Sequence, residues 1–107
     1  MELWEEIVTI ERQLNEALAS FRQNGIKSCE AENEYQIEKS KEILRLKDEG
    51  MPTTLIPHIV KGLPNVAKLN FERSVADVVY KANQEAINIK KLQLRVLEGQ
   101  IEREYNG

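Results

Sequence analysis

All three prolines of this chain fall between residues 52 and 64, and they divide the sequence into two long proline-free segments. Proline removes a backbone donor and clashes with the preceding turn, so helix interiors exclude it. Both flanking segments are rich in Glu, Lys, Leu, Arg and Ala, which favour helices. The sequence therefore predicts a single helical domain over residues 1–107. It has one arm over residues 2–49, a connector over residues 50–63 and a second arm over residues 64–105.

The first arm carries apolar residues at alternating intervals of four and three, the heptad spacing of a helix packed against another helix. These residues are Leu3, Ile7, Ile10, Leu14, Ala17 and Phe21. Asn24-Gly25 either ends this helix or lies inside it, where a glycine costs about 1 kcal/mol. The same spacing continued reaches Ser28, Ala31 and Tyr35, and the last two fit it. We therefore expect a near-continuous arm with a kink or break at Gly25.

The connector contains turn and capping signals. Gly50 is suited to the C-terminus of the first arm, and Pro52 lies just beyond it. Thr53 or Thr54 is expected to cap a short helix that Gly62 closes. A short connector between two long helices makes them antiparallel neighbours.

The second arm begins at Pro64, which suits the first turn of a helix, and its apolar residues do not form one stripe. One heptad-like seam comprises Phe71, Val75, Val78, Ala82, Ala86 and Ile89. A second comprises Leu94, Leu97, Ile101 and Tyr105, while Leu92 and Val96 lie off its line.

A two-helix hairpin has one internal interface, so it cannot cover apolar residues on several sides of one helix. We predict that the surplus forms an oligomer interface, made by Leu92, Leu94, Val96, Leu97 and Ile101. If the N-terminal segment folded back at Gly25, a three-helix bundle within the chain would cover them instead. The predicted fold is thus all-α, a long antiparallel helical hairpin with a connector helix, assembled as a helical-bundle homo-oligomer.

Composition and charge exclude several classes of protein. The net charge is −3, and the excess of acids lies before residue 50, which disfavours a nucleic-acid partner. No apolar run approaches the roughly 20 residues of a membrane span. Cys29 is the single cysteine, so no disulfide forms within the chain. We therefore expect a cytoplasmic protein without a membrane partner.

No motif for catalysis is present in the sequence. There is no Gly-rich phosphate loop, nucleophile elbow or metalloprotease motif. His58 is the single histidine, so a zinc site would need an unusual ligand set. We predict a protein that is not an enzyme and uses no cofactor or metal.

Two binding alternatives remain from the residues. Residues 43–60 resemble a helix-turn-helix, but the second helix offers DNA only His58 and Lys61, and Pro57 interrupts it. The better interpretation is a structural helical corner. The second arm carries an arginine, an aromatic ring and nearby polar residues. They could bind a phosphate and stack on a base, or they could lie at the edge of an interface. These residues are Asn70, Arg73, Tyr80, Lys81 and Asn83.

Three segments carry a resemblance: Ala31-Glu32-Asn33-Glu34-Tyr35, residues 42–52 (EILRLKDEGMP) and residues 71–105. Together they resemble small all-helical proteins of uncharacterised role encoded by phages and prophages of Gram-positive bacteria. The resemblance implies an accessory protein that binds a host or phage factor in the bacterial cytoplasm. A subgroup of such proteins sequesters cyclic nucleotide signals between subunits, which makes an anti-defence nucleotide sponge the alternative function.

Overall fold

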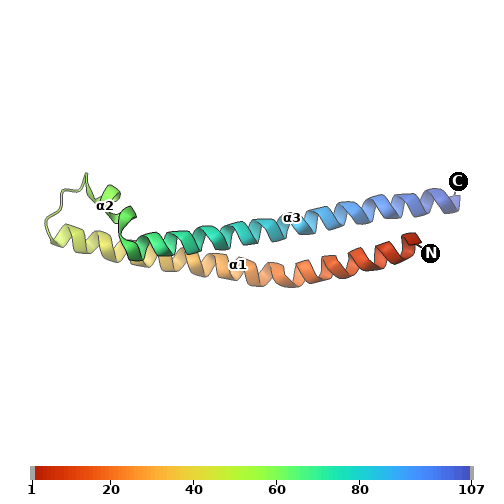
Figure 1. Cartoon of the computed structure of the whole chain (residues 1–107), viewed down its shortest axis with the longest axis horizontal. Helices are drawn as coiled ribbons and strands as arrows, with labels where there is room; N and C mark the ends of the chain where they lie inside the picture. Colours follow the sequence, from red (N-terminus) through yellow and green to blue (C-terminus); the bar gives the residue numbers. More distant parts are fainter. Residues whose placement is uncertain (1, 107) are drawn as a thin grey trace. The chain divides into compact units, whose positions relative to one another are not determined.

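The computed structural model describes residues 2–106, and all regular secondary structure in this range is helical (Figure 1). Helix α1 spans Glu2–Asp48, α2 spans Ile56–Gly62 and α3 spans Pro64–Asn106. Each long helix ends within one residue of the arm expected from the sequence. The all-α class, the two long helices and the connector helix are confirmed.

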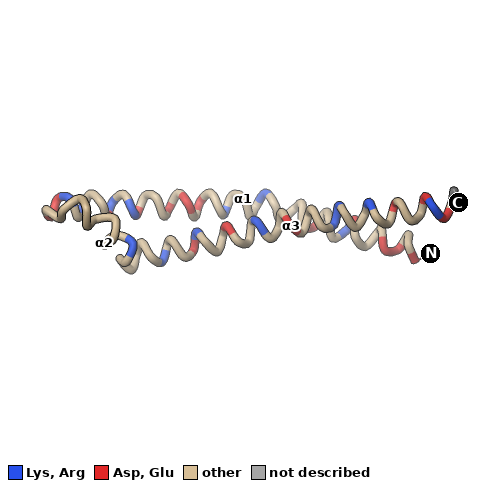
Figure 2. The backbone as a smooth tube through the Cα atoms, turned by 90° about the horizontal axis from the view of Figure 1, so that it is seen from above, with Lys and Arg blue, Asp and Glu red and all other residues tan. Residues whose placement is uncertain are grey.

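The chain divides into two compact units, and both long helices contribute to each. Unit 1 consists of Met1–Asn24 and Val79–Gly107, and unit 2 of Gly25–Val78. Within each unit a segment of α1 runs antiparallel to a segment of α3 (Figures 1 and 2). Charged residues of both signs are distributed along these segments (Figure 2).

Helix α1 continues through Asn24-Gly25 without interruption, and Gly25 does not have a positive φ. The expected continuity is confirmed, but the helix has no break at Gly25, and the alternative in which the N-terminal segment folds back there is wrong. A single internal glycine costs about 1 kcal/mol. The strong helix formers on both sides, and the part-buried hydrogen bond made by Asn24, offset that cost.

Helix α1 ends in a Schellman motif centred on Gly50, as the sequence predicts. Gly50 has φ 85°, and its N–H donates to the Lys47 carbonyl at 3.0 Å. The Met51 N–H donates to the Leu46 carbonyl at 3.1 Å. Met51 also packs against the hydrophobic cluster that contains Leu46, which is the apolar contact typical of this motif.

Helix α2 begins differently from the expectation. Its N-cap is Leu55, with no side-chain capping bond, so the predicted cap by Thr53 or Thr54 is wrong. Instead the backbone N–H groups of Leu55 and Ile56 donate to the Pro52 carbonyl at 3.0 and 3.3 Å. This hydrogen-bonded turn supplies the start of the helix, and the two threonines are exposed.

The core of unit 2 lies where all three helices meet. Its buried residues are Tyr35 and Leu46 from α1, Ile56 and Val60 from α2, and Val66 from α3. Val60 and Val66 are each only 1% exposed. Because α2 contributes its apolar side to this core, the connector is a structural corner, with His58 and Lys61 exposed.

The core of unit 1 is a two-helix interface. Ile7 from α1 and Ile87 and Leu97 from α3 are buried. The remaining predicted seam of the first arm is half-buried: Leu3, Ile10, Leu14, Ala17 and Phe21. Leu94 and Ile101 are also half-buried. The seam predicted for the first arm is therefore confirmed. In the second arm, the seam predicted from Leu94 to Tyr105 is confirmed except for Tyr105, which is exposed.

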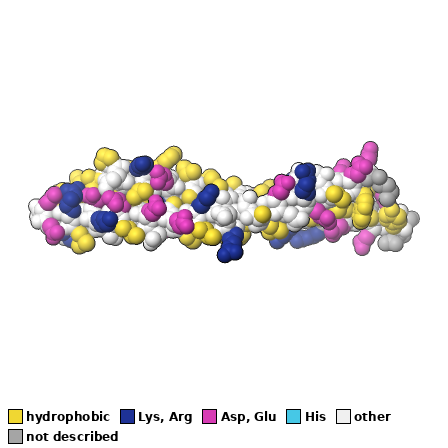
Figure 3. Space-filling model, turned by 90° about the horizontal axis from the view of Figure 1, so that it is seen from below, with side chains coloured by type: hydrophobic (Ala, Val, Ile, Leu, Met, Phe, Trp, Pro, Cys, Tyr) yellow, Lys and Arg dark blue, Asp and Glu magenta, His cyan; other side chains and the backbone are white. Residues whose placement is uncertain are grey.

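The seam expected from Phe71 to Ile89 lies on the exposed side of α3, so the prediction that it packs against the first arm is wrong. Its members Phe71, Val75, Val78, Ala82 and Ile89 are all exposed, and Figure 3 shows hydrophobic side chains on the surface. The less exposed line follows other residues at the same 3–4 spacing: Val66, Leu69, Arg73 and Ala76 in unit 2, and Tyr80, Asn83 and Ile87 in unit 1. Apolar periodicity alone missed this line because Arg73 and Asn83 interrupt it.

Candidate functional site

Arg73 is the centre of a polar cluster in unit 2. Its Nη1 donates to Glu32 Oε2 at 3.1 Å, and its Nη2 and Nε donate to Asn70 Oδ1 at 2.7 and 3.2 Å. Its Cζ lies 4.5 Å from the centroid of the buried Tyr35 ring, a cation–π contact. The guanidinium thus uses three of its five N–H donors and one face for contacts within the chain.

The Glu32 carboxylate is stabilised in its charged form. Hydrogen bonds from Gln36, foremost, and then from Arg73 lower the pKa of this carboxyl below its ordinary value. The cluster borders a groove of about 740 Å³, lined by Ser28, Cys29, Glu32, Asn33, Gln36, Arg73, Ser74, Asp77 and Val78. An incoming phosphate would meet the Glu32 and Asp77 carboxylates as well as Arg73.

Tyr80 and Asn83 join the two helices of unit 1. The Tyr80 ring stacks on Phe21 with centroids 5.0 Å apart and planes inclined by 26°. Asn24 Nδ2 donates to Asn83 Oδ1 at 2.7 Å, and Asn83 Nδ2 donates to the Ala17 carbonyl at 2.9 Å. A part-buried asparagine pair on a helix–helix seam favours one register, because a shift would leave these polar groups unpaired.

The structure therefore places the five expected ligand residues as follows. Asn70 and Arg73 belong to the unit 2 cluster, and Tyr80 and Asn83 pack against α1 in unit 1. Lys81 is exposed on α3. Asn70 bonds to Arg73, while Arg73, Tyr80 and Asn83 contact α1, so a bound ligand would have to compete with those contacts.

The five expected interface residues lie on two sides of α3 in unit 1. Leu97 is buried, and Leu94 and Ile101 are half-buried. Leu92 and Val96 are 59% and 52% exposed. With the exposed Ala82 and Ile89 they form a line at intervals of seven, three and four, which we call the outer face of unit 1.

A groove at the end of unit 1 was not expected from the sequence. It has a volume of about 660 Å³, and Leu3, Trp4, Ile101 and Tyr105 line it together with the carboxylates of Glu2 and Glu104. The acidic start of the chain is visible in the sequence and in Figure 2. What brings Trp4 to Tyr105 is the antiparallel register of the helices, which no local pattern specifies.

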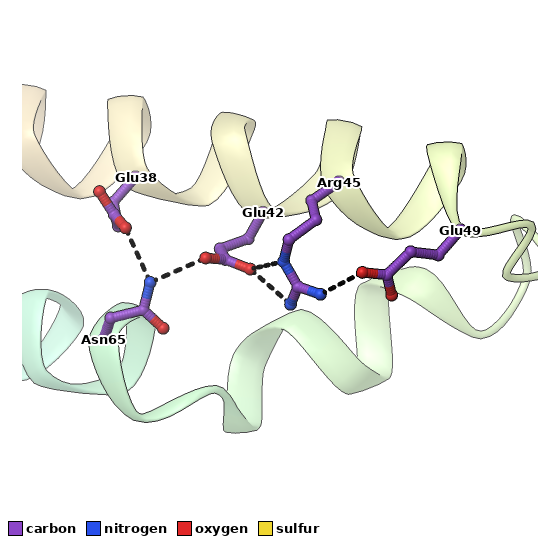
Figure 4. Close-up of polar contacts among 5 residues, drawn as sticks. All are labelled: Glu38, Glu42, Arg45, Glu49 and Asn65. Atoms are coloured by element: carbon purple, nitrogen blue, oxygen red, sulfur yellow. Dashed lines mark hydrogen bonds and ion pairs between the residues drawn. The ribbon is translucent and has the colours of Figure 1, made fainter.

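A polar network that ties α3 to α1 in unit 2 was also missed (Figure 4). Asn65 Nδ2 donates to Glu38 Oε1 at 2.7 Å and to Glu42 Oε1 at 3.0 Å. Arg45 pairs with Glu42 and Glu49 at 2.7 and 2.8 Å. Arg45, foremost, and Asn65 lower the pKa of Glu42. The spacing of three and four between the charged residues signals their pairing, but nothing local signals Asn65.

Within residues 2–106, no group of three or more His, Cys, Asp or Glu side chains is arranged to hold a metal ion. None of the described helices is long and apolar enough to cross a membrane. No family model, curated protein or solved structure matches this chain.

Proposed function

We propose that this protein acts by binding other proteins rather than by catalysis, and that it does so as a homo-oligomer. The observation that carries the proposal is the outer face of unit 1, formed by Ala82, Ile89, Leu92 and Val96. Its spacing is that of a helix–helix seam. Because other residues of α3 already pack on α1, a second copy of the chain is the proposed occupant of this face.

The exposed surface of the chain supports this proposal. It measures 7915 Å² at a mass of 12.4 kDa, whereas about 6,100 Å² is typical of a monomeric protein of that mass. The excess is thus about 1,800 Å². A standard protein–protein interface removes about 800 Å² from each partner, so the excess is large enough for a stable dimer contact.

Unit 1 alone has more apolar surface than its two helices cover. Among its described residues, the buried hydrophobic ones are Ile7, Ile87 and Leu97. Its large exposed hydrophobic residues are Trp4, Val8, Leu18, Val79, Ile89, Leu92, Val96 and Tyr105. Contiguous apolar patches on a surface usually mark an interaction site.

The residues beside the outer face also favour a second copy. Along one side of the face, α3 presents Val79, Ala86 and Gln93, none of which is charged. Two identical helices can therefore approach along this side without like-charge repulsion. Glu85 is the single acidic residue between Ala82 and Val96. Its carboxylate would restrict the registers in which two copies can pair.

The alternative of a nucleotide sponge receives less support from the geometry, because Arg73 is held by Glu32, Asn70 and Tyr35. A DNA-binding role also receives less support, because α2 packs its apolar side into the core of unit 2. The resemblance to phage and prophage proteins supplies the proposed setting, which is an accessory protein in a bacterial cytoplasm.

Sedimentation equilibrium of the purified chain and of Leu92→Ala tests the oligomer. Full burial of a leucine contributes about 1.5–3 kcal/mol, and Leu92 is 59% exposed, so about 0.9–1.8 kcal/mol per copy is available to an interface. A symmetric dimer contains this contact twice. We expect Leu92→Ala to weaken association by about 20- to 400-fold.

Leu44→Ala is the matched control, since Leu44 is 62% exposed but lies on α1 in unit 2. It should leave the dissociation constant unchanged. A wild-type chain that stays monomeric at concentrations of tens of micromolar would refute the oligomer, as would equal weakening by the two substitutions.

A further inference from the structure

We infer that the groove at the end of unit 1 binds a basic amphipathic segment of a partner protein, with an apolar side chain of that segment lying between Trp4 and Tyr105. The groove is formed by the first turn of α1 and the last turns of α3. This site is distinct from the outer face of unit 1, and the inference does not require self-association.

The floor and walls of the groove are apolar and aromatic. Leu3 and Ile101 continue the half-buried seam, whereas Trp4 and Tyr105 remain 60% and 70% exposed. Trp and Tyr are enriched among the residues that contribute most to protein–protein binding, because each offers a large, rigid apolar area with one polar group. An exposed pair of this kind beside apolar residues is an anchor site for a partner's side chain.

The charge of the groove selects the partner. Its two ionisable side chains other than Tyr105 are the carboxylates of Glu2 and Glu104. A second groove of about 560 Å³ adjoins it along α1 and is lined by Glu2, Glu5, Glu6, Thr9 and Ile10. Four carboxylates therefore border these two grooves without a lysine or arginine among the lining residues. A third, smaller groove shares Leu3 and Glu104 with the first and adds Arg103, so the three adjoining grooves together carry four carboxylates and one guanidinium.

The length of this surface favours a peptide segment over a small cation. Residues 2–10 of α1 span about 12 Å at 1.5 Å per residue, which matches about two turns of a helical ligand. A segment with lysines or arginines next to large apolar residues can place an apolar anchor between the aromatic rings and its cations beside the glutamates. Complementary charges of this kind give orientation and a fast, salt-dependent association.

Trp4 is the only tryptophan of the chain, so its emission reports directly on this groove. The probe is a tryptophan-free synthetic peptide with leucines at helical positions i, i+3, i+4 and i+7 and lysines elsewhere. The control peptide has glutamate in place of every lysine. We expect saturable binding of the lysine peptide, with a blue shift of Trp4 emission and an affinity that falls as salt is added. The glutamate peptide should not bind.

Variants of the full chain separate anchoring from charge. Tyr105→Ala should weaken binding of the lysine peptide by about tenfold or more, and Glu104→Lys by roughly fivefold or more. Glu16→Lys makes the same change of net charge on an exposed position of α1 outside both grooves, and it should leave the affinity unchanged. Circular dichroism of each variant checks that its helix content is that of the wild type.

Each of four results would overturn the inference. With the peptides, these are no change of Trp4 emission on adding the lysine peptide, or equal binding of the glutamate peptide. With the variants and the protein alone, they are equal weakening by Glu16→Lys and Glu104→Lys, or a blue shift produced by raising the protein concentration alone. The last result would mean that a second copy fills the groove. Failure of the outer-face proposal is recognised separately, by the mass of the wild-type chain in sedimentation.

Discussion

The asparagine pair on the seam of unit 1 allows a quantitative test of what holds α1 and α3 in register. Asn83 makes two part-buried hydrogen bonds, whereas Asn24 makes one of them as donor. A hydrogen bond contributes about 0.5–1.5 kcal/mol, and leaving a buried partner unsatisfied costs about 1–3 kcal/mol. Losing the bond from Asn83 to the Ala17 carbonyl costs that hydrogen bond but leaves no unsatisfied carbonyl, because Ala17 lies inside α1 and its carbonyl keeps a backbone partner.

Asn83→Ala is therefore expected to lower the free energy of unfolding by about 1.5–3 kcal/mol. Asn24→Ala should lower it by only about 0.5–1.5 kcal/mol, because the bond from Asn83 to Ala17 survives. The double variant should cost less than the sum of the two, since both single changes remove the same bond. Urea unfolding followed by circular dichroism, at one fixed protein concentration, measures all three.

Asn88→Ala is the control, because Asn88 is exposed on α3 in the same unit and should change the stability by less than about 0.5 kcal/mol. The reasoning is refuted if Asn24→Ala costs as much as Asn83→Ala, or if the two effects simply add. Either result would mean that the asparagines do not act as a pair.

The remaining predictions concern the glycines and the acid behaviour of the chain. Gly50→Ala should destabilise the protein by about 1–2 kcal/mol, because φ at Gly50 is 85°. Gly99→Ala should stabilise it by about 0.5–1 kcal/mol, because Gly99 lies inside α3 with nothing within 4 Å of an added Cβ. Urea unfolding measures both changes in the free energy of unfolding, and changes of the same sign would contradict this reasoning. The pKa of Glu42 is lowered by Arg45 and Asn65, so its contribution to stability is present above the ordinary value of 4.5 and is lost as the pH falls through the lower value of the folded state. Carbon NMR of the carboxyl groups should show Glu42 titrating below 4.5, and Arg45→Gln should raise that midpoint; a midpoint unchanged by Arg45→Gln would contradict the assignment.

The ends of the helices could be predicted from the sequence because they depend on local chemistry. Proline and the positive φ of Gly50 act within one turn, so the Schellman motif and the start of α3 at Pro64 follow from a few residues. The seam of the first arm is equally local, since its apolar residues recur at intervals of four and three without interruption from Leu3 to Phe21. The start of α2 was missed, because the backbone turn at Pro52 replaces a side-chain cap.

The packing side of α3 was decided only by the tertiary structure. Its sequence offers two lines with the same 3–4 spacing, and the more apolar line, at Phe71, Val75 and Val78, is the exposed one. The line that packs contains Arg73 and Asn83, whose polar ends are satisfied by Glu32 and Tyr35 in unit 2 and by Asn24 and Ala17 in unit 1. Those partners lie on α1, far away in sequence, so no window of α3 reveals that its polar residues can be buried. The groove between Trp4 and Tyr105 has the same origin, because the antiparallel register of two long helices brings together residues from the two ends of the sequence.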